Sequence, residues 1–449
     1  MSSFEPDKTD VRRLRDALEG DDERLPILLD DYHASEIALL FDQLDGGERE
    51  RIINILDVEK ASAVLSEMDE EAHPEELLFQ LEPEKRAEII EELDYDDATD
   101  IIAQLDTDEQ RQILETLDEE DASNIRELLT YSEDSAGGLM NTGIIKVNIN
   151  LRKKEAMDEI IRQSEDLDDF YIYVVDDSDM LKGLISLKEI LKARWDKPVS
   201  SMVNEDFVYV SEDTDQEEVA RLISQYNLTS IPVVDRRMKL LGRITVDDIL
   251  DVVEEENTED MLKFSGVSEN EELSGGWRDA IRSRLPWLII NLGTAFLASA
   301  IIRSFGATLD RLIILGSYMT VIAGMGGNSA TQALAVTIRR ISLSSLSDKQ
   351  TYNTVLKELL VGLTNGAVIG LVVFLVACFY DHNVRLGVVL LLAMAGNLLI
   401  AGFTGSAIPM LLKRIGVDPA VASSIIITTF TDCFGFLLLL GLASKLLLS

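Results

Sequence analysis

Cysteine and histidine are scarce in this chain of 449 residues, which argues against a protein built on disulfides or on a thiolate metal site. The two cysteines, Cys378 and Cys433, lie in apolar runs, so neither a disulfide framework nor a thiolate zinc site is indicated. The three histidines, His33, His73 and His382, are scattered. No GxxxxGKS/T loop, HExxH motif or Ser/His/Asp pattern stands out, so we predict neither an ATP-driven pump nor any enzyme.

Positive charge is also scarce, and its distribution divides the chain in two. The sequence has 41 Lys and Arg against 81 Asp and Glu, a net charge of −40. Residues 284–449 include 11 basic and 6 acidic side chains, whereas the preceding part carries a net charge of −45. Such a part repels nucleic acid and anionic lipid and attracts cations. A merely solubilising acidic surface is the alternative.

A repeat of about twelve residues runs through residues 44–118. An apolar residue followed by an acidic one recurs at Leu44-Asp45, Leu56-Asp57, Met68-Asp69, Leu81-Glu82, Leu93-Asp94, Leu105-Asp106 and Leu117-Asp118. Each acidic residue can cap a short helix, Pro83 suits a first helical position, and Asp94 with Asp97 or Asp106 with Glu109 resembles a capping box. Short helices must stack to bury their apolar faces, so we predict an all-α superhelical domain over residues 1–132.

A second repeat follows, with a period of 59 residues. Val174-Val175-Asp176, Gly183, Ile185, Ser186, Ile190 and Leu191 recur as Val233-Val234-Asp235, Gly242, Ile244, Thr245, Ile249 and Leu250. Each copy has the pattern helix, apolar strand, turn, strand, helix. This register resembles a tandem pair of CBS (cystathionine-β-synthase) modules, which implies an α/β sensor over residues 133–256.

Five apolar runs follow a polar connecting segment, residues 257–284, in which we expect a helix. The runs lie near 285–305, 311–338, 357–380, 386–412 and 420–447, and each is long enough to span a bilayer. They predict a five-helix α transmembrane domain over residues 285–449. With the acidic domains inside, nine Lys and Arg lie on the inner side and four on the outer side.

The location of the chain follows from the same features. The first ten residues, MSSFEPDKTD, lack a basic start and an apolar run, so we expect no signal peptide. We therefore predict a multi-pass protein of the inner (cytoplasmic) membrane in contact with lipid. Its acidic domains should be cytoplasmic, and five spans would place the C-terminus outside.

One acidic residue, Asp432, lies in the middle of the apolar run SSIIITTFTDCFGFLLLL. A carboxylate there is costly unless it faces water, a cation or a partner, so we predict that it lines a cation path. A buried structural hydrogen bond is the alternative. Ser423, Ser424, Thr428 and Thr431 fall on roughly the same helical face and could offer oxygens to a hydrated ion, unless they bond to their own helix.

Two glycine patterns occur among the apolar runs. The sequence Gly324-Met325-Gly326-Gly327-Asn328 predicts a broken helix in which Gly326, Gly327 and Asn328 line a pore, with close helix packing as the alternative. The row Gly362, Gly366 and Gly370 predicts helix packing.

A cluster of acidic residues follows the second α/β module. Its members are Asp247, Asp248, Asp251, Glu254, Glu255, Glu256, Glu259 and Asp260. These charges repel one another across any interface, and Mg²⁺ suits such a surface because it keeps most of its waters and needs only one or two carboxylates. An exposed acidic helix end is the alternative.

The order of these parts resembles the MgtE magnesium channel family over nearly the whole chain. The matching stretches are TVDDILDVVEEENTED (245–260), GMGGNSATQ (324–332), GVDPA (416–420) and TTFTDCFG (428–435). The resemblance implies a homodimer with its pore between two membrane halves. It also assigns Asp432 as the central pore carboxylate and Asp418 as an acid at the cytoplasmic mouth.

The same resemblance implies regulatory magnesium positions. They fall on Asp248, Asp251, Glu256, Glu259 and Asp260, with further sensor positions at Asp215 and Glu217 and a solenoid acid near Asp94 or Asp97. Thr245 with Asp248 resembles the ribose-binding pair of nucleotide-binding CBS modules, which implies ATP or another adenosyl ligand, although an acidic cleft would repel phosphate.

Two positions depart from the family pattern. Thr331 and Ser424 stand where the family can have Asn. These departures leave the choice among Mg²⁺, Mn²⁺, Co²⁺ and Ni²⁺ open.

The sequence thus predicts a Mg²⁺-gated magnesium channel whose cytoplasmic domains sense Mg²⁺ and close the pore. A CBS-regulated carrier of another divalent metal or of an anion is one alternative, although no basic residue lies mid-span to favour an anion. A membrane-anchored nucleotide sensor is the other alternative. It would give no reason for a carboxylate at Asp432 in the middle of an apolar run.

Overall fold

The computed structural model describes residues 8–18, 25–41, 43–69, 72–163, 171–268, 271, 276–342, 348–421 and 424–448. The chain forms two compact units, Met1–Glu254 and Glu255–Ser449.

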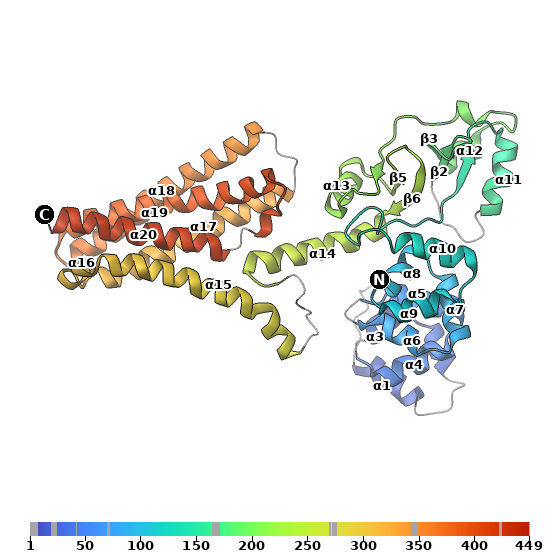
Figure 1. The fold of residues 1–449 in the computed structure, drawn as a ribbon, viewed down its shortest axis with the longest axis horizontal. Helices are drawn as coiled ribbons and strands as arrows, with labels where there is room; N and C mark the ends of the chain where they lie inside the picture. Colours follow the sequence, from blue (N-terminus) through green and yellow to red (C-terminus); the bar gives the residue numbers. More distant parts are fainter. Residues whose placement is uncertain are drawn as a thin grey trace. The chain divides into compact units, whose positions relative to one another are not determined.

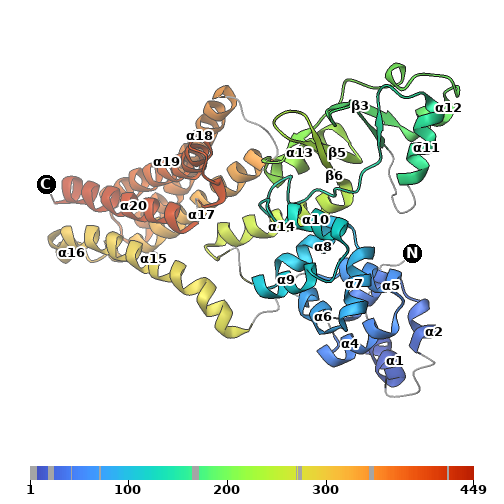
Figure 2. The same ribbon diagram turned by 45° about the vertical axis from the view of Figure 1, so that its right-hand side comes forward.

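The first unit begins with the short helices that the twelve-residue repeat predicts (Figure 1). They are α1 (Lys8–Leu18), α2 (Leu25–Asp30), α3 (Ala34–Phe41), α4 (Gly46–Ile55), α5 (Val58–Ser66), α6 (Pro74–Gln80), α7 (Pro83–Glu92), α8 (Tyr95–Ala103), α9 (Thr107–Leu114) and α10 (Glu119–Leu128). Helices two places apart in the chain pack together, α3 with α5, α5 with α7, α4 with α6 and α8 with α10 (Figures 1 and 2). This stacking gives the predicted all-α domain.

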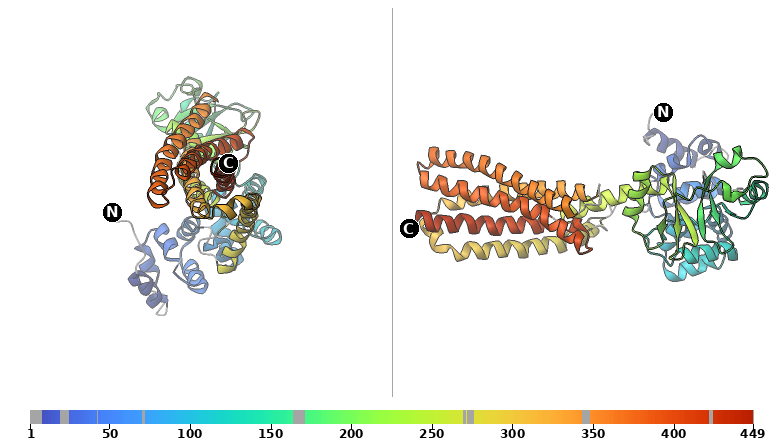
Figure 3. Two further views of the ribbon diagram at one scale, coloured as in Figure 1. Left: turned by 90° about the vertical axis from the view of Figure 1, so that its left-hand side faces the viewer. Right: turned by 90° about the horizontal axis from the view of Figure 1, so that it is seen from above.

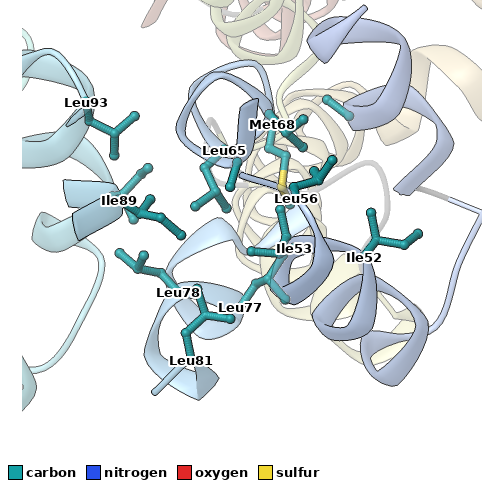
Figure 4. Packing of buried hydrophobic residues seen from close by; sticks show 14 of the residues in the cluster. Ile52, Ile53, Leu56, Leu65, Met68, Leu77, Leu78, Leu81, Ile89 and Leu93 are labelled. Atoms are coloured by element: carbon teal, nitrogen blue, oxygen red, sulfur yellow. The ribbon is translucent and has the colours of Figure 1, made fainter. Parts of the chain in front are cut away.

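The apolar residue of each repeat points into one continuous core (Figure 4). Leu56, Met68, Leu81 and Leu93 are all buried there, between helices that contribute Ile53, Leu65, Leu78 and Ile89. None of these short helices could bury its face alone, so the core depends on the stack.

The acidic residues of the repeat other than Asp69 lie at a helix start, but only some of them cap through the side chain. Asp106 forms the predicted capping box with Glu109 at α9, and Pro83 takes the first position of α7. The predicted box of Asp94 and Asp97 is wrong. Asp94 is the N-cap of α8 without a side-chain bond, because the N–H of Asp97 donates to the Asp96 carboxylate at 3.1 Å.

Two α/β modules follow in the chain, and their strands repeat one topology. The first contains β1 (Lys146–Asn148), α11 (Lys153–Gln163), β2 (Tyr171–Val175), β3 (Leu181–Ser186) and α12 (Leu187–Lys192). The second contains β4 (Val210–Ser211), α13 (Gln216–Tyr226), β5 (Ser230–Val234), β6 (Leu240–Thr245) and α14 (Val246–Ser265). In each, the first strand pairs parallel and the third antiparallel to the middle one, and the antiparallel pair repeats the same register 59 residues apart.

The two modules share a small core. Tyr173, Val175 and Leu181 of the first pack with Val234 and Leu240 of the second. This shared core makes the two modules one pseudo-symmetric pair, as the repeat predicts.

The second unit is a bundle of long helices (Figure 3, right). They are α15 (Trp277–Ser304), α17 (Leu315–Ser342), α18 (Asp348–Tyr380), α19 (Val384–Arg414) and α20 (Ser424–Leu447), with the short helices α16 (Gly306–Arg311) and η3 (Pro419–Val421) between them. Helix α17 packs on α19 and α20, α18 packs on α19, and α15 packs on α20. Much of α15 and α18 therefore stays on the outside of the bundle.

Four described helices are long and apolar enough to cross a membrane. They contain residues Trp277–Ser304, Gln350–Tyr380, Val384–Arg414 and Ser424–Leu447. Helix α17 has 28 residues but carries more small and polar side chains than these four.

The prediction of a broken helix at Gly324–Asn328 is wrong, because α17 runs through this segment without interruption. Gly326 in this segment serves close packing, because a Cβ there would lie 2.2 Å from Nδ2 of Asn397. The row Gly362, Gly366 and Gly370 also serves packing, as predicted: a Cβ on these residues would lie 2.3, 2.8 and 2.9 Å from backbone atoms of α19.

Candidate functional site

Asp432 lies in α20 with its side chain half-buried, and it makes no hydrogen bond or ion pair with any described residue. The structural hydrogen bond that was the alternative for this carboxylate is therefore not present among those residues. A carboxylate without a partner in an apolar helix remains open to water or a cation.

The hydroxyl groups near Asp432 bond to their own helix. Thr428 donates to the carbonyl oxygen of Ser424 at 2.8 Å, and Thr431 donates to that of Thr428 at 2.9 Å. Thr431 is fully buried, so it does not belong to an open polar face with Asp432, against the prediction. Ser424 and Thr428 remain half-buried, and Ser423 lies outside the described residues.

The three residues of α17 predicted to line a pore have different surroundings. Gly326 is buried against Asn397 and Thr431, and a Cβ on Gly327 would lie 3.3 Å from the methyl group of Thr428. Asn328 is exposed on the bundle surface. Among these residues, only Asn328 has a side chain that could reach an ion.

The first unit gathers acidic side chains from α8 and from the start of α14. Asp96 is 8% exposed, and its burial beside Asp97, Asp248 and Asp94 raises its pKa well above the usual value. Burial, reinforced by Asp94, Asp248 and Asp247, raises the pKa of Asp97 to about 7. The pKa of Asp248 is raised for the same reasons. These groups resist ionisation because they are buried and lie beside one another's negative charges.

The same cluster extends along α14. Burial and the charges of Glu67, Glu254 and Asp247 raise the pKa of Asp251. The sequence missed Asp96 and Glu67, because neither belongs to the family stretches and a helix position alone does not distinguish them from exposed acids. We name the set Asp94, Asp96, Asp97, Asp247, Asp248, Asp251 and Glu67 the sensor cluster.

A second group of acids lies in the other unit, at the end of α14 and before η3. Burial, with the charges of Asp418 and Glu256, raises the pKa of Asp260 to about 6. Lys263 pairs with Glu259, and its Nζ lies 3.1 Å from the Asp418 carboxylate. An internal ammonium group therefore already neutralises part of this group, which we name the mouth cluster: Glu256, Glu259, Asp260 and Asp418.

The remaining predicted residues have local roles in the first unit. Asp215 caps α13 by accepting a bond from the N–H of Glu217 at 3.0 Å, and both residues are exposed. Asp248 accepts bonds from the N–H and hydroxyl of Thr245 at 3.0 and 2.5 Å. This bond orients Asp248 within the sensor cluster.

The carboxylates of the sensor and mouth clusters suit a hydrated ion better than an ion that is coordinated by protein atoms alone. Among the described residues, no three His, Cys, Asp or Glu side chains converge closely enough to hold a metal. Mg²⁺ usually keeps several waters and is held through one or two carboxylates, so loosely grouped acids fit its chemistry. The pKa shifts point the same way, since a bound cation would favour the ionised carboxylates.

Known families match the helical domain, both α/β modules and most of the bundle. Residues 319–442 match the MgtE family of divalent cation transporters, residues 32–134 match the MgtE intracellular N domain, and residues 136–196 and 199–255 match CBS domains. The magnesium transporters MgtE of Enterococcus faecalis and Thermus thermophilus are 36% and 35% identical to this chain. Each match covers 71% of this chain, and the matches cover 70% and 72% of the two relatives, respectively.

Solved structures match the first unit. The crystal structure of the cytosolic domain of the Mg²⁺ channel MgtE in complex with ATP is 36% identical, with a TM-score of 0.51 over 54% of this chain and 99% of that one. The crystal structure of the soluble part of a magnesium transporter is 28% identical, with a TM-score of 0.50 over 56% of this chain and 98% of that one.

The fold and these matches define a membrane transporter of divalent cations that carries an intracellular helical domain and a CBS pair. The chain belongs to the MgtE magnesium transporter family. The members of this family are transporters and channels rather than enzymes, as the sequence predicted.

Proposed function

We propose that the chain is a Mg²⁺ channel in which Asp432 binds the passing ion and the acidic domains close the pore when internal Mg²⁺ is high. The observation that carries the pore assignment is the Asp432 carboxylate, which has no partner among the described residues of an apolar helix. Its charge is tolerable there if it faces water and a cation.

The proposed pore needs five spans and two copies. At a rise of 1.5 Å per residue, the 28 residues of α17 are roughly 42 Å long, enough to cross a bilayer. Packing on α19 and α20 covers part of α17, which explains why it tolerates polar residues. A pore between two copies gives the exposed Asn328 a place away from lipid. Analytical ultracentrifugation in detergent should give a dimer, and a monomer would contradict this arrangement.

Orientation follows from the basic residues and the number of spans. Five spans with cytoplasmic acidic domains place the C-terminus outside. A tag after Ser449 should react with a membrane-impermeant reagent in sealed cells. Labelling only after lysis would contradict the fifth span.

Regulation by Mg²⁺ follows from the crowded acids. Without a cation, the sensor and mouth clusters repel their own members, as the raised pKa values of Asp97 and Asp260 indicate. Mg²⁺ binds the compact arrangement better because only there do carboxylates lie close enough to share an ion. A ligand that prefers one state shifts the population toward it.

ATP is a second proposed ligand, and a cavity favours it. A cavity of about 570 Å³ lies at the edge of the first module and is lined by Tyr171, Ser186, Leu187, Lys188, Leu191 and Lys192 of that module and by Thr229 of the second. Apolar and aromatic side chains suit a base, and two lysines suit phosphates. Ser186 is the counterpart of Thr245, so the nucleotide would occupy the other module from the one predicted. Lys188→Ala should weaken ATP binding in titration calorimetry, and unchanged affinity would exclude this cavity.

Growth of a magnesium-dependent bacterial strain tests the pore. Asp432→Ala should abolish rescue while the protein still accumulates in the membrane, because the ion loses its only mid-span carboxylate. Asp310→Asn removes an exposed acid from α16 of the same unit and should rescue normally. Normal rescue by Asp432→Ala would refute the pore assignment.

A further inference from the structure

Asn397 of α19 is a fully buried polar residue in the centre of the apolar bundle. Its Nδ2 donates to the carbonyl oxygen of Ile322 in α17 at 3.0 Å. Its Oδ1 is buried with no hydrogen-bond partner. An unbonded polar atom at such a place destabilises the fold. A leucine of similar size has no polar atom and would avoid this loss of stability.

The Asn397 side chain lies between two glycines from two other helices. A Cβ on Gly326 of α17 would lie 2.2 Å from Nδ2, and a Cβ on Gly435 of α20 would lie 2.8 Å from Nδ2 and 3.0 Å from Oδ1. No side chain fits at either position without displacing Asn397. One amide therefore accounts for a glycine in each of two sequence stretches, GMGGN and TTFTDCFG.

The position of this contact relates it to the ion path. Gly435 follows Asp432 by three residues, so the Asn397 amide touches the helical turn that carries the proposed pore carboxylate. Thr431, next to Asp432, also packs at Gly326. A Cβ added to Gly326 would lie 3.3 Å from the Cβ of Thr431. The contact thus joins the two helices that present Asp432 and Asn328.

We infer that Asn397 is a positioning residue of the pore, which fixes the height and rotation of α20 against α17 and so the place of the Asp432 carboxylate. This inference rests on the proposed role of Asp432. The bond to Ile322 sets the position of the amide, and the two glycines let both helices close on it. A residue kept only for packing would not need this unbonded Oδ1, so the amide must be retained for the position that its Nδ2 bond sets.

Ion selectivity is the readout that separates positioning from simple packing. The test compares Mg²⁺ and Mn²⁺ flux in proteoliposomes for the native protein, Asn397→Leu and Asn397→Ser. We expect the half-saturating Mg²⁺ concentration to rise about tenfold and the preference between the ions to change, because a displaced carboxylate holds the hydrated ion less well. Asn291→Leu, at an exposed position of α15, is the matched control and should change neither.

A packing role predicts a different pattern. Lower thermal stability with native selectivity and native half-saturation would overturn the inference. If neither Asn397 variant folds, Gly326→Ala and Gly435→Ala press on the same amide from either side, and selectivity that is native in both would also overturn it. Asp432→Asn is measured in parallel. If Asp432→Asn conducts normally, the proposed pore is refuted. If Asp432→Asn loses flux while the Asn397 variants keep native selectivity, only the positioning role of Asn397 is refuted.

Discussion

At the scale of single residues, Asp97 shows how the acidic domains depend on solution conditions. Its pKa of about 7 in the folded protein lies above the value of about 4 that an unfolded chain gives. Between these values the folded protein binds more protons than the unfolded one. The stability that this proton provides is complete below about pH 4 and is lost as pH rises through about 7.

A pH-dependent melting experiment follows from this sign. Without divalent cations, the melting temperature of the first unit should fall by roughly 4 °C or more between pH 5 and pH 8, and Mg²⁺ should restore it mainly at pH 8. Asp97→Asn should flatten both dependences, since the amide cannot ionise. Asp108→Asn, at an exposed position of α9, should behave as the native protein. A larger Mg²⁺ effect at pH 5 than at pH 8 would contradict this account.

Lys263 allows a second prediction at this scale. Its ammonium group neutralises Glu259 and Asp418, so it competes with Mg²⁺ for the mouth cluster. Lys263→Gln should therefore lower the Mg²⁺ concentration that protects residues 130–275 from limited proteolysis, by about tenfold. Arg282→Gln, at an exposed position of α15, serves as the control. A requirement for more Mg²⁺ in Lys263→Gln would mean that the lysine holds the cluster together.

At the scale of elements, the sequence predicted what repeats and periodicity determine. The stacked helices, the two α/β modules and the packing row of Gly362, Gly366 and Gly370 are all present. The broken helix at Gly324–Asn328 was wrong, because the reason for Gly326 is a side chain on α19, 71 residues away. The acid Asp96 was missed for a similar reason, since its burial depends on packing that no local pattern reveals.

The helix caps provide an element-scale test. Asp106→Ala removes two side-chain bonds to the first turn of α9 and should lower the free energy of unfolding by about 1 kcal/mol. Asp118→Ala changes an N-cap of α10 that makes no such bond, so it should lower the free energy of unfolding by less than Asp106→Ala does. Chemical denaturation of both variants gives the comparison. Equal losses would show that charge near the helix start, rather than the hydrogen bond, supplies the stability.

At the scale of the whole molecule, charge and apolar surface are divided between two functions. The net charge of −45 before residue 284 concentrates cations at the acidic domains, whereas the bundle carries few charges. The sequence predicted this division and the family, but it could not locate Asn397 or the cavity of the first module. Those features depend on which helices and strands pack together.

Flux of Mg²⁺ through the purified protein tests the central claim most directly. Proteoliposomes would hold the protein with its acidic domains outward, and the Mg²⁺ concentration on that side would be raised stepwise. We predict that the native protein conducts at low Mg²⁺ and closes as Mg²⁺ rises, that Asp432→Asn does not conduct at any concentration, and that Asp97→Asn with Asp248→Asn conducts but closes only at higher Mg²⁺. Flux through Asp432→Asn equal to the native flux, or native flux that does not fall with Mg²⁺, would contradict the account.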